Sequence, residues 1–251
     1  NITRPKTALI SLSDKTNLDE LIKFLVAQNV KIISTGGTYQ AIKNITDEVI
    51  EVSDFTGFEE MMDGRVKTLH PKIHAGILAR RDKDLEVLED RGYEVIDLVI
   101  VNLYPFKETI ASDCTFEEAI EKIDIGGPTM IRSAAKNFKD VAVITNPNDY
   151  STLMSEWSEQ GGISYEFRKQ LSQKVFALMV DYNSAIADYL SEQADKLPDY
   201  NFEQSSILRY GENPHQSAKI LTFSGLQHRN IANAEIIQGK ELSYNNIVDA
   251  D

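Results

Sequence analysis

The stretch Thr7–Val26, TALISLSDKTNLDELIKFLV, decides the fold class of this chain. Its opening part, Thr7–Ser13, is a short apolar run that predicts a buried strand. Asp14 or Thr16 is then available as the N-terminal cap of a helix. The apolar residues that follow have helical spacing: Leu18, Leu21, Ile22, Leu25 and Val26. A strand that leads directly into a helix is the repeating unit of α/β proteins.

The same alternation continues along the chain. Apolar, β-branched runs predict strands at Val30–Ser34, Val49–Val52, Val95–Asn102 and Val141–Thr145. Helical patterns are predicted at Tyr39–Ile45, Phe116–Ile123, Thr129–Asn137 and Tyr150–Trp157, with a long polar loop after Val52. Strands separated by helices pair mostly in parallel, with helices on both faces of the sheet. Ligands of such sheets bind at the carboxyl ends of the strands.

The stretch Ser164–Gln193 predicts one long helix with a single apolar face. That face either packs on the sheet or joins two subunits, and the sequence leaves both open. The polar stretch Ala194–Gln204 contains Pro198 and ends the pattern. We therefore expect a first domain over residues 1–194 and a linker over 195–204.

Composition narrows the function classes. Lys and Arg total 26 against 39 Asp and Glu, a formal charge of −13, which argues against nucleic acid or an anionic membrane as a partner. A bound phosphate therefore needs a local cluster of cations. Cys114 is the only cysteine, so an internal disulfide framework and a cysteine zinc site are excluded. The absence of a signal-like opening and of an apolar run of about 20 residues predicts a cytoplasmic protein.

Two polar turns follow predicted strands. Ser13-Asp14-Lys15 follows the first strand, and Thr35-Gly36-Gly37-Thr38 follows the second. Paired glycines let backbone N–H groups approach an anion, and a helix N-terminus adds partial positive charge, so a phosphate fits there. The glycine spacing matches neither a dinucleotide fingerprint nor a Walker loop, and a Gly-Gly pair taken alone is more often only a turn.

The segment Asp63–Pro71, DGRVKTLHP, carries three potentially cationic side chains: Arg65, Lys67 and His70. A solvated loop is the ordinary interpretation, but a basic cluster in an acidic chain favours a clamp for a phosphate or a carboxamide. His70 and His74 have the i, i+4 spacing of a metal pair. Pro71 between them and the lack of an HExxH glutamate favour structural histidines instead.

A further pair of segments lies at strand and helix ends. Asn102–Pro105 leaves the most strand-like run, and Asp124–Thr129, DIGGPT, begins a helix whose glycines expose N–H donors. Asp124 is also explained as a simple helix N-terminal acid, which stabilises by about 0.3–1 kcal/mol. Lys136 ends that helix, where a cation is expected for structural reasons alone.

Read together, these motifs resemble one family, the bifunctional purine biosynthesis proteins that are both AICAR formyltransferase and IMP cyclohydrolase. The segments that carry the resemblance are SLSDKT, STGGT, GRVKTLHP, HAGILAR, VNLYPF, IDIGGPTMIRSAAKN and LRYGENPHQ. The resemblance implies a methylglyoxal-synthase-like α/β fold with a mostly parallel sheet for residues 1–194. It implies the beginning of a second α/β domain, that of the formyltransferase, for residues 205–251.

The resemblance also implies roles for individual residues. Those that would line the nucleotide site are Ser13, Lys15, Thr35, Gly36, Gly37, Thr38, Arg65 and Thr68. Asn102, Gly126 and Gly127 would approach the base. The chemical groups would be Lys67, Tyr104, Asp124 and Lys136, and AICAR would contact Arg209 and Tyr210. A straight helix from Gly126 to Lys136 would, however, separate Asp124 from Lys136 by roughly 15–18 Å.

The implied reaction is the dehydration of formyl-AICAR to IMP, with no metal or redox cofactor. The longer protein would use 10-formyltetrahydrofolate as co-substrate and would be a homodimer. No KHANPCG-like segment with the family's Lys-His pair occurs in the sequence, so we expect a fragment that cannot transfer a formyl group. Two rivals share the fold: a methylglyoxal-synthase-like lyase and a non-catalytic nucleotide-sensing module.

Overall fold

The structure is a computed structural model that describes residues 2–191, 202–223 and 237–249. The chain divides into two compact units, Asn1–Leu190 and Ser191–Asp251.

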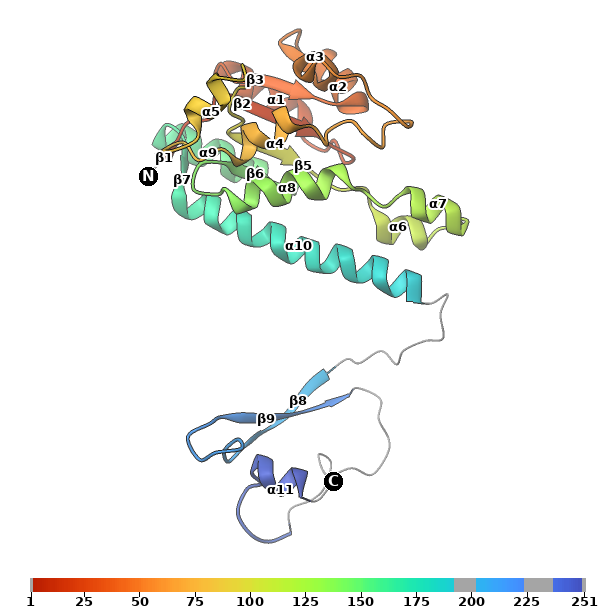
Figure 1. The fold of residues 1–251 in the computed structure, drawn as a ribbon, viewed down its shortest axis with the longest axis vertical. Coiled ribbons are helices and arrows are strands. Elements are labelled where there is room, and N and C mark those ends of the chain that lie inside the picture. The colour runs from red at the N-terminus through yellow and green to blue at the C-terminus, as the bar shows by residue number, and fades with distance from the viewer. Residues whose placement is uncertain (1, 192–201, 224–236, 250–251) are drawn as a thin grey trace. The chain divides into compact units, whose positions relative to one another are not determined.

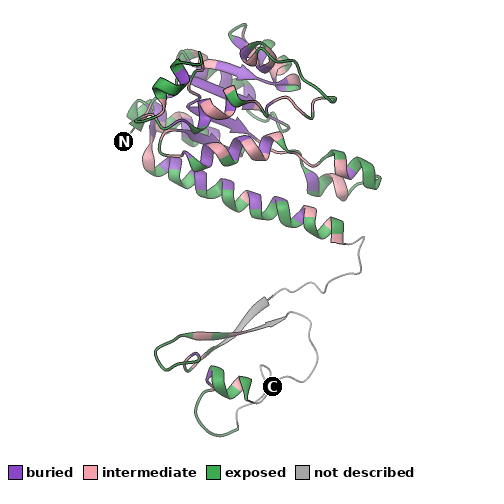
Figure 2. Cartoon of the chain, viewed as in Figure 1, coloured by how far each residue is buried: buried purple, intermediate pink, exposed green. Residues whose placement is uncertain are grey.

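The first unit is built on a five-stranded sheet with the strand order β4-β3-β2-β5-β6, in which every pair is parallel. The strands are β2 (Thr7–Ser11), β3 (Lys31–Ser34), β4 (Val49–Glu51), β5 (Leu98–Val101) and β6 (Ala142–Ile144). All four residues of β5 and all three of β6 are buried, because helices cover both faces (Figure 2). The predicted parallel α/β sheet is confirmed.

Helices form the layers on either side of this sheet (Figure 1). They are α1 (Leu18–Ala27), α2 (Gly36–Lys43), α3 (Val52–Thr56), α4 (Pro71–Leu78), α5 (Leu85–Glu89), α6 (Phe106–Ile110), α7 (Phe116–Glu121), α8 (Gly126–Lys136), η1 (Pro147–Asp149), α9 (Tyr150–Gln160) and α10 (Tyr165–Ser191). The α1 and α9 helices meet where Phe24 packs edge-on against Trp157 with 5.6 Å between ring centroids. The α8 and α10 helices run side by side, and Ser172 Oγ donates to the Ala135 carbonyl at 2.8 Å.

The polar loop predicted after Val52 is wrong over part of its length, because it contains α3, α4 and α5. These helices are only five to eight residues long, too short for an apolar period to stand out. The α4 helix packs closely against the chain at Gly76. A Cβ there would lie 2.6 Å from the Glu94 carbonyl, so only glycine lets the helix approach the chain before β5.

Two helix starts also differ from expectation. Neither Asp14 nor Thr16 caps α1: Asn17 precedes the helix with φ 58°, and its side chain makes no capping hydrogen bond. Asp14 instead accepts from the Thr16 N–H and hydroxyl, at 2.9 and 2.7 Å, in a local turn. The α2 helix begins at Gly36, so the expected Gly-Gly turn is the first turn of a helix.

A small antiparallel pair, β1 (Ile2–Thr3) with β7 (Ile163–Ser164), completes the first unit. The second unit holds an antiparallel hairpin of β8 (Phe202–Leu208) and β9 (Ala218–Phe223), and a short helix α11 (Tyr244–Val248). Most of the linker predicted at 195–204 lies outside the described residues, so that boundary stays a prediction. Among the described helices, none has the length and apolar character required to cross a membrane.

Candidate active site

The carboxyl ends of β2 and β3 are fastened together by hydroxyl groups. Ser11 and Thr35 share a hydrogen bond of 2.9 Å between their hydroxyls. The Thr38 hydroxyl accepts from the Leu12 N–H at 2.8 Å and donates to the Leu12 carbonyl at 3.0 Å. Neighbouring parallel strands end at the same edge, and these bonds hold the start of α2 against the loop that follows β2. The expected residues Thr35, Gly36, Gly37 and Thr38 therefore lie at this edge.

The loop after β2 is held from the other side by the residue that follows β5. Asn102 Oδ1 accepts from the N–H groups of Ser13 and Asp14, at 2.6 and 3.0 Å. Asn102 Nδ2 donates to the Asp14 carbonyl at 2.7 Å, and Lys15 Nζ donates to the Leu12 carbonyl at 3.1 Å. Asn102 thus shapes the Ser13–Lys15 loop, and its implied approach to a base stays a prediction.

Lys67 lies against the first turn of α2. Its Nζ would be 3.4 Å from a Cβ built on Gly36, a residue with φ +43° where a side chain would be strained. The ammonium group is 2.6 Å from Glu60 Oε2 and 3.9 Å from Glu51 Oε1, and the side chain is only 20% exposed. A cavity of about 450 Å³ opens here, lined by Gly36, Gln40, Glu51, Ser53, Phe58, Glu59, Glu60 and Lys67. A cation beside a helix N-terminus suits an oxyanion.

The basic loop also touches the start of α8. Thr68 is buried, and its Oγ1 lies 2.5 Å from the position that a Cβ on Gly126 would take. Only glycine at residue 126 permits this approach. Arg65, in the same loop, forms an exposed ion pair with Glu121 at the end of α7. The segment Arg65–Thr68 is thereby joined to the turn that carries Asp124.

Asp124 is a half-buried carboxylate at the beginning of α8. Its Oδ1 accepts from the Gly127 N–H at 2.9 Å. Burial raises the pKa of Asp124, and hydrogen bonds from the backbone N–H groups of Gly127 and Tyr104 oppose that rise. A carboxylate with a raised pKa is suited to accept a proton. The Tyr104 side chain is 53% exposed, with Lys122 Nζ 6.0 Å from its ring centroid.

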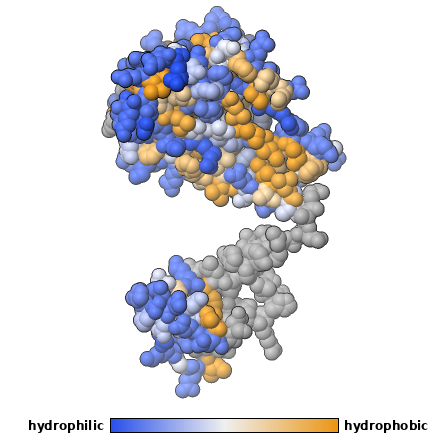
Figure 3. All heavy atoms as spheres, in the orientation of Figure 1, coloured by the Kyte–Doolittle hydropathy of each residue, from blue (hydrophilic) through white to orange (hydrophobic). Residues whose placement is uncertain are grey.

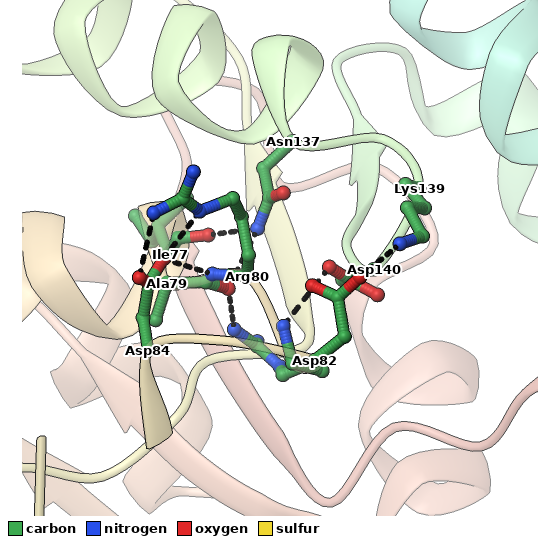
Figure 4. Close-up of polar contacts among 9 residues, drawn as sticks. Ile77, Ala79, Arg80, Asp82, Asp84, Asn137, Lys139 and Asp140 are labelled. Carbon is green, nitrogen blue, oxygen red and sulfur yellow. Dashed lines mark hydrogen bonds and ion pairs between the residues drawn. The ribbon is translucent and has the colours of Figure 1, made fainter. Parts of the chain in front are cut away.

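Lys136 is not brought to these residues. The α8 helix is continuous from Gly126 to Lys136, a rise of about 15 Å. Beyond it, Asn137 Nδ2 donates to the carbonyls of Ile77 and Ala79 at 2.8 and 3.0 Å (Figure 4). The Arg81 N–H donates to Asp140, just before β6, at 3.2 Å. This end of α8 is therefore tied to the amino edge of the sheet, opposite the edge that holds Asp124.

The two histidines have contacts within the fold. His70 Nδ1 accepts from the Lys72 N–H at 3.1 Å and caps α4. His74 Nδ1 lies 3.2 Å from Ser133 Oγ, on α8, and burial lowers the pKa of His74. These contacts favour the structural interpretation of the histidines over the metal pair.

Arg209 and Tyr210 lie in the second unit and contact each other. The guanidinium carbon is 4.9 Å from the Tyr210 ring centroid, and Arg209 Nη2 donates to the Tyr210 hydroxyl at 3.2 Å. Hydrogen bonds from Ser243 and Arg209 lower the pKa of Tyr210. Their expected contact with AICAR stays a prediction.

Sequence reasoning missed three side chains around the site. Glu60 pairs with Lys67, and Glu121 pairs with Arg65. In the sequence, both glutamates look like ordinary exposed acids. The Tyr182 hydroxyl accepts from the Asp124 N–H at 2.8 Å. Tyr182 falls on the apolar period of α10, so the sequence identifies the ring as core and gives no sign of the hydroxyl's partner.

Comparison with known proteins agrees with this architecture. The model of the MGS-like domain family matches residues 17–129. The model of the AICARFT/IMPCHase bienzyme family matches residues 134–251. In structure, the chain is similar to ForH, whose crystal structure gives a TM-score of 0.63 at 33% identity and covers 72% of this chain and 96% of that chain.

Curated relatives match almost the whole chain. It is 51% identical over 253 residues to the bifunctional purine biosynthesis protein PurH of Bacillus cereus (strain AH820). The PurH protein of Bacillus anthracis (strain CDC 684 / NRRL 3495) matches at the same identity. Each match covers 98% of this chain and 50% of the relative, so the chain spans about half the length of the curated relatives it matches. The chain belongs to the AICARFT/IMPCHase family of bifunctional purine biosynthesis proteins, and its first unit has the MGS-like fold.

Proposed function

We propose that the first unit is an IMP cyclohydrolase, which closes the second purine ring of formyl-AICAR and releases water to give IMP. The observation that carries this proposal is the contact between Thr68 and Gly126. It joins a loop rich in cations to the turn of a half-buried carboxylate at one edge of the sheet. Membership of a purine biosynthesis family supports the assignment.

One end of this site suits the 5′-phosphate. The proposed phosphate and ribose contacts are Ser13, Lys15, Thr35, Gly36, Gly37, Thr38, Arg65 and Thr68. The start of α2 offers backbone N–H groups and the positive end of a helix dipole. Because the whole chain carries a formal charge of −13, these local donors must overcome an unfavourable field. Glu60 and Glu121 now hold the nearby cations, and a phosphate would compete with both carboxylates for them.

The other end suits the ring closure. A carboxamide nitrogen is a poor nucleophile, so holding it against the formyl carbon lowers the barrier by several kcal/mol. We assign to Asp124 the removal of the carboxamide proton as the new C–N bond forms. Backbone N–H groups at Tyr104, Gly126 and Gly127 are the proposed donors to the developing oxyanion. The oxyanion takes up a proton to become a hydroxyl. The hydroxyl receives a second proton and leaves as water, while the formamide nitrogen loses its proton and the C=N bond forms. Lys67 is a cation at this edge of the sheet.

The resemblance alone supports Lys136 as a further proton donor, because the end of α8 that carries it lies at the opposite edge of the sheet from Asp124. The variant Lys136→Ala should keep its affinity for IMP and lose most turnover if that role is correct. Lys139→Ala is the matched control, since Lys139 is an exposed lysine paired with Asp82 near the same end of α8. Equal turnover in Lys136→Ala and wild type would remove Lys136 from the mechanism.

The proposal extends to the longer protein. We propose that residues 205–251 begin a formyltransferase domain in which Arg209 and Tyr210 contact AICAR. The co-substrate would be 10-formyltetrahydrofolate, whereas the cyclohydrolase would need no cofactor. We propose that the protein's ligands are small purine nucleotides. We also propose that the protein works as a homodimer in the cytoplasm. Exposed Phe176 and Val180 on α10 support an association surface.

An absorbance assay of formyl-AICAR conversion tests the proposed function. We expect turnover to IMP by the first unit with no added metal or folate. Binding of IMP without turnover would instead favour a nucleotide-sensing module. Phosphate release from a triose phosphate, without conversion of formyl-AICAR, would favour a methylglyoxal-synthase-like lyase.

A further inference from the structure

Tyr182 connects the long helix α10 to both segments that carry the proposed chemistry. Its hydroxyl accepts from the Asp124 backbone N–H at 2.8 Å, across 58 residues of sequence. Its ring packs edge-on against Phe106, with 6.3 Å between centroids. Phe106 begins α6 directly after Tyr104 and Pro105. The buried Tyr182 side chain therefore contacts both Asp124 and the segment that follows Tyr104.

The bond to Tyr182 fixes the backbone on which the Asp124 carboxylate stands. The same residue is held at three points: its N–H by Tyr182, and its carboxylate by the N–H groups of Gly127 and Tyr104. Ile125, the next residue, is exposed and offers little packing of its own. A buried N–H without an acceptor is costly, so loss of the hydroxyl would let this turn move toward water.

We propose that Tyr182 is a positioning residue for Asp124, which sets the direction of the carboxylate toward the reacting amide. This inference rests on the proposed cyclohydrolase function. A proton acceptor must lie within hydrogen-bond reach of the proton that it removes, so a small shift of the turn is costly to turnover. Most of the proposed phosphate and ribose contacts lie on other elements, so affinity for the nucleotide should change far less than turnover.

The test compares Tyr182→Phe with wild type in the formyl-AICAR assay and in IMP binding. Phenylalanine keeps the ring against Phe106 and removes only the acceptor. We expect kcat to fall at least tenfold, with KM for formyl-AICAR and Kd for IMP each within about twofold of wild type. The matched control is Tyr165→Phe, which removes a hydroxyl from the same helix about 25 Å earlier and should leave kcat unchanged.

The outcomes separate the two proposals. An active wild type with an equally active Tyr182→Phe would overturn the positioning role alone. A parallel loss of kcat and IMP affinity would also overturn it, because that result indicates a general structural role. A wild-type chain that binds IMP but never converts formyl-AICAR would overturn the proposed function and this inference together. Faster hydrogen exchange at the Asp124 amide in Tyr182→Phe is the expected signature of the lost bond.

Discussion

The ionised form of Asp124, which the proposed reaction needs, destabilises the folded chain. Burial raises the pKa of its carboxyl, so the folded chain binds this proton more tightly than the unfolded chain does. The ionised carboxylate therefore costs stability. This cost is absent below the pKa of an unfolded aspartate, about 3.9, and is complete above the raised pKa of the folded protein.

The variant Asp124→Asn separates the role of the carboxylate in turnover from its cost to stability. We expect kcat to fall by about 10²–10⁴, the usual contribution of a general base, because the amide cannot take up the proton. We also expect Tm at pH 7 to rise above the wild-type value, with the difference narrowing as the pH falls toward 4. Turnover assays and thermal melts at several pH values measure both.

Glu118 serves as a control, because its pKa is shifted in the opposite direction to that of Asp124. Hydrogen bonds with Thr115 in a capping box lower the pKa of Glu118, so its ionised form favours the folded state. Glu118→Gln should lower Tm slightly at pH 7, with the effect fading under acid conditions. A lower Tm for Asp124→Asn at pH 7 would contradict the assigned cost of burying that carboxylate.

At the scale of elements, the start of α8 depends on a glycine that the helix itself does not need. Alanine usually stabilises a helix by about 0.5–1 kcal/mol relative to glycine. A methyl group at Gly126 would, however, meet Thr68 Oγ1 at 2.5 Å. We expect Gly126→Ala to lower Tm despite its helix propensity and to weaken IMP binding at least tenfold, as measured by calorimetry.

The α2 helix supplies the comparison for stability. Gly37 lies in its first turn, and a Cβ there would meet nothing within 4 Å. Gly37→Ala should therefore keep or raise Tm, as propensity alone predicts. If both alanine variants were equally stable, the contact between Thr68 and Gly126 would not constrain the site.

The elements that the sequence predicts well are those with long or pure patterns. The apolar runs around β2 and β5 and the extended period of α10 were sufficient to place strand, strand and helix. The short helices α3, α4 and α5 were not predictable, because tertiary packing decides them. Gly76 is an example, because a side chain there would clash with the segment before β5, which lies outside the sequence pattern of α4.

The location of the proposed site residues was predictable to the same limit. Local motifs and resemblance pointed to Lys67, Thr68 and Asp124, whose roles stay predictions, and the structure places all three at the carboxyl edge of the sheet. They could not reveal that Glu60 pairs with Lys67 within the loop, or that Tyr182 bonds to Asp124 across 58 residues of sequence. The resemblance alone grouped Lys136 with Asp124, and the unbroken helix carries Lys136 to the other edge, as the separation expected for a straight helix requires.

At the scale of the whole molecule, the long helix α10 has an apolar character on two sides. One side is buried against the first unit, through residues such as Leu171, Val175 and Met179. The other leaves Phe176 43% exposed and Val180 69% exposed, one helical turn apart. Figure 3 shows an apolar area on the side of the first unit where α6, α7 and the later part of α10 lie. Such surfaces commonly mark association sites.

The variant Val180→Glu tests the proposed homodimer. A carboxylate on this face would be buried without a partner on association, and repulsion is added because each chain already carries a formal charge of −13. We expect the dimer to dissociate at least tenfold more readily in analytical ultracentrifugation, with Tm of the isolated protomer nearly unchanged. Val87→Glu on α5, where the valine is 53% exposed, is the matched control and should leave association intact. A wild-type chain that stays monomeric at all concentrations, or equal dissociation of both variants, would exclude α10 as the association surface.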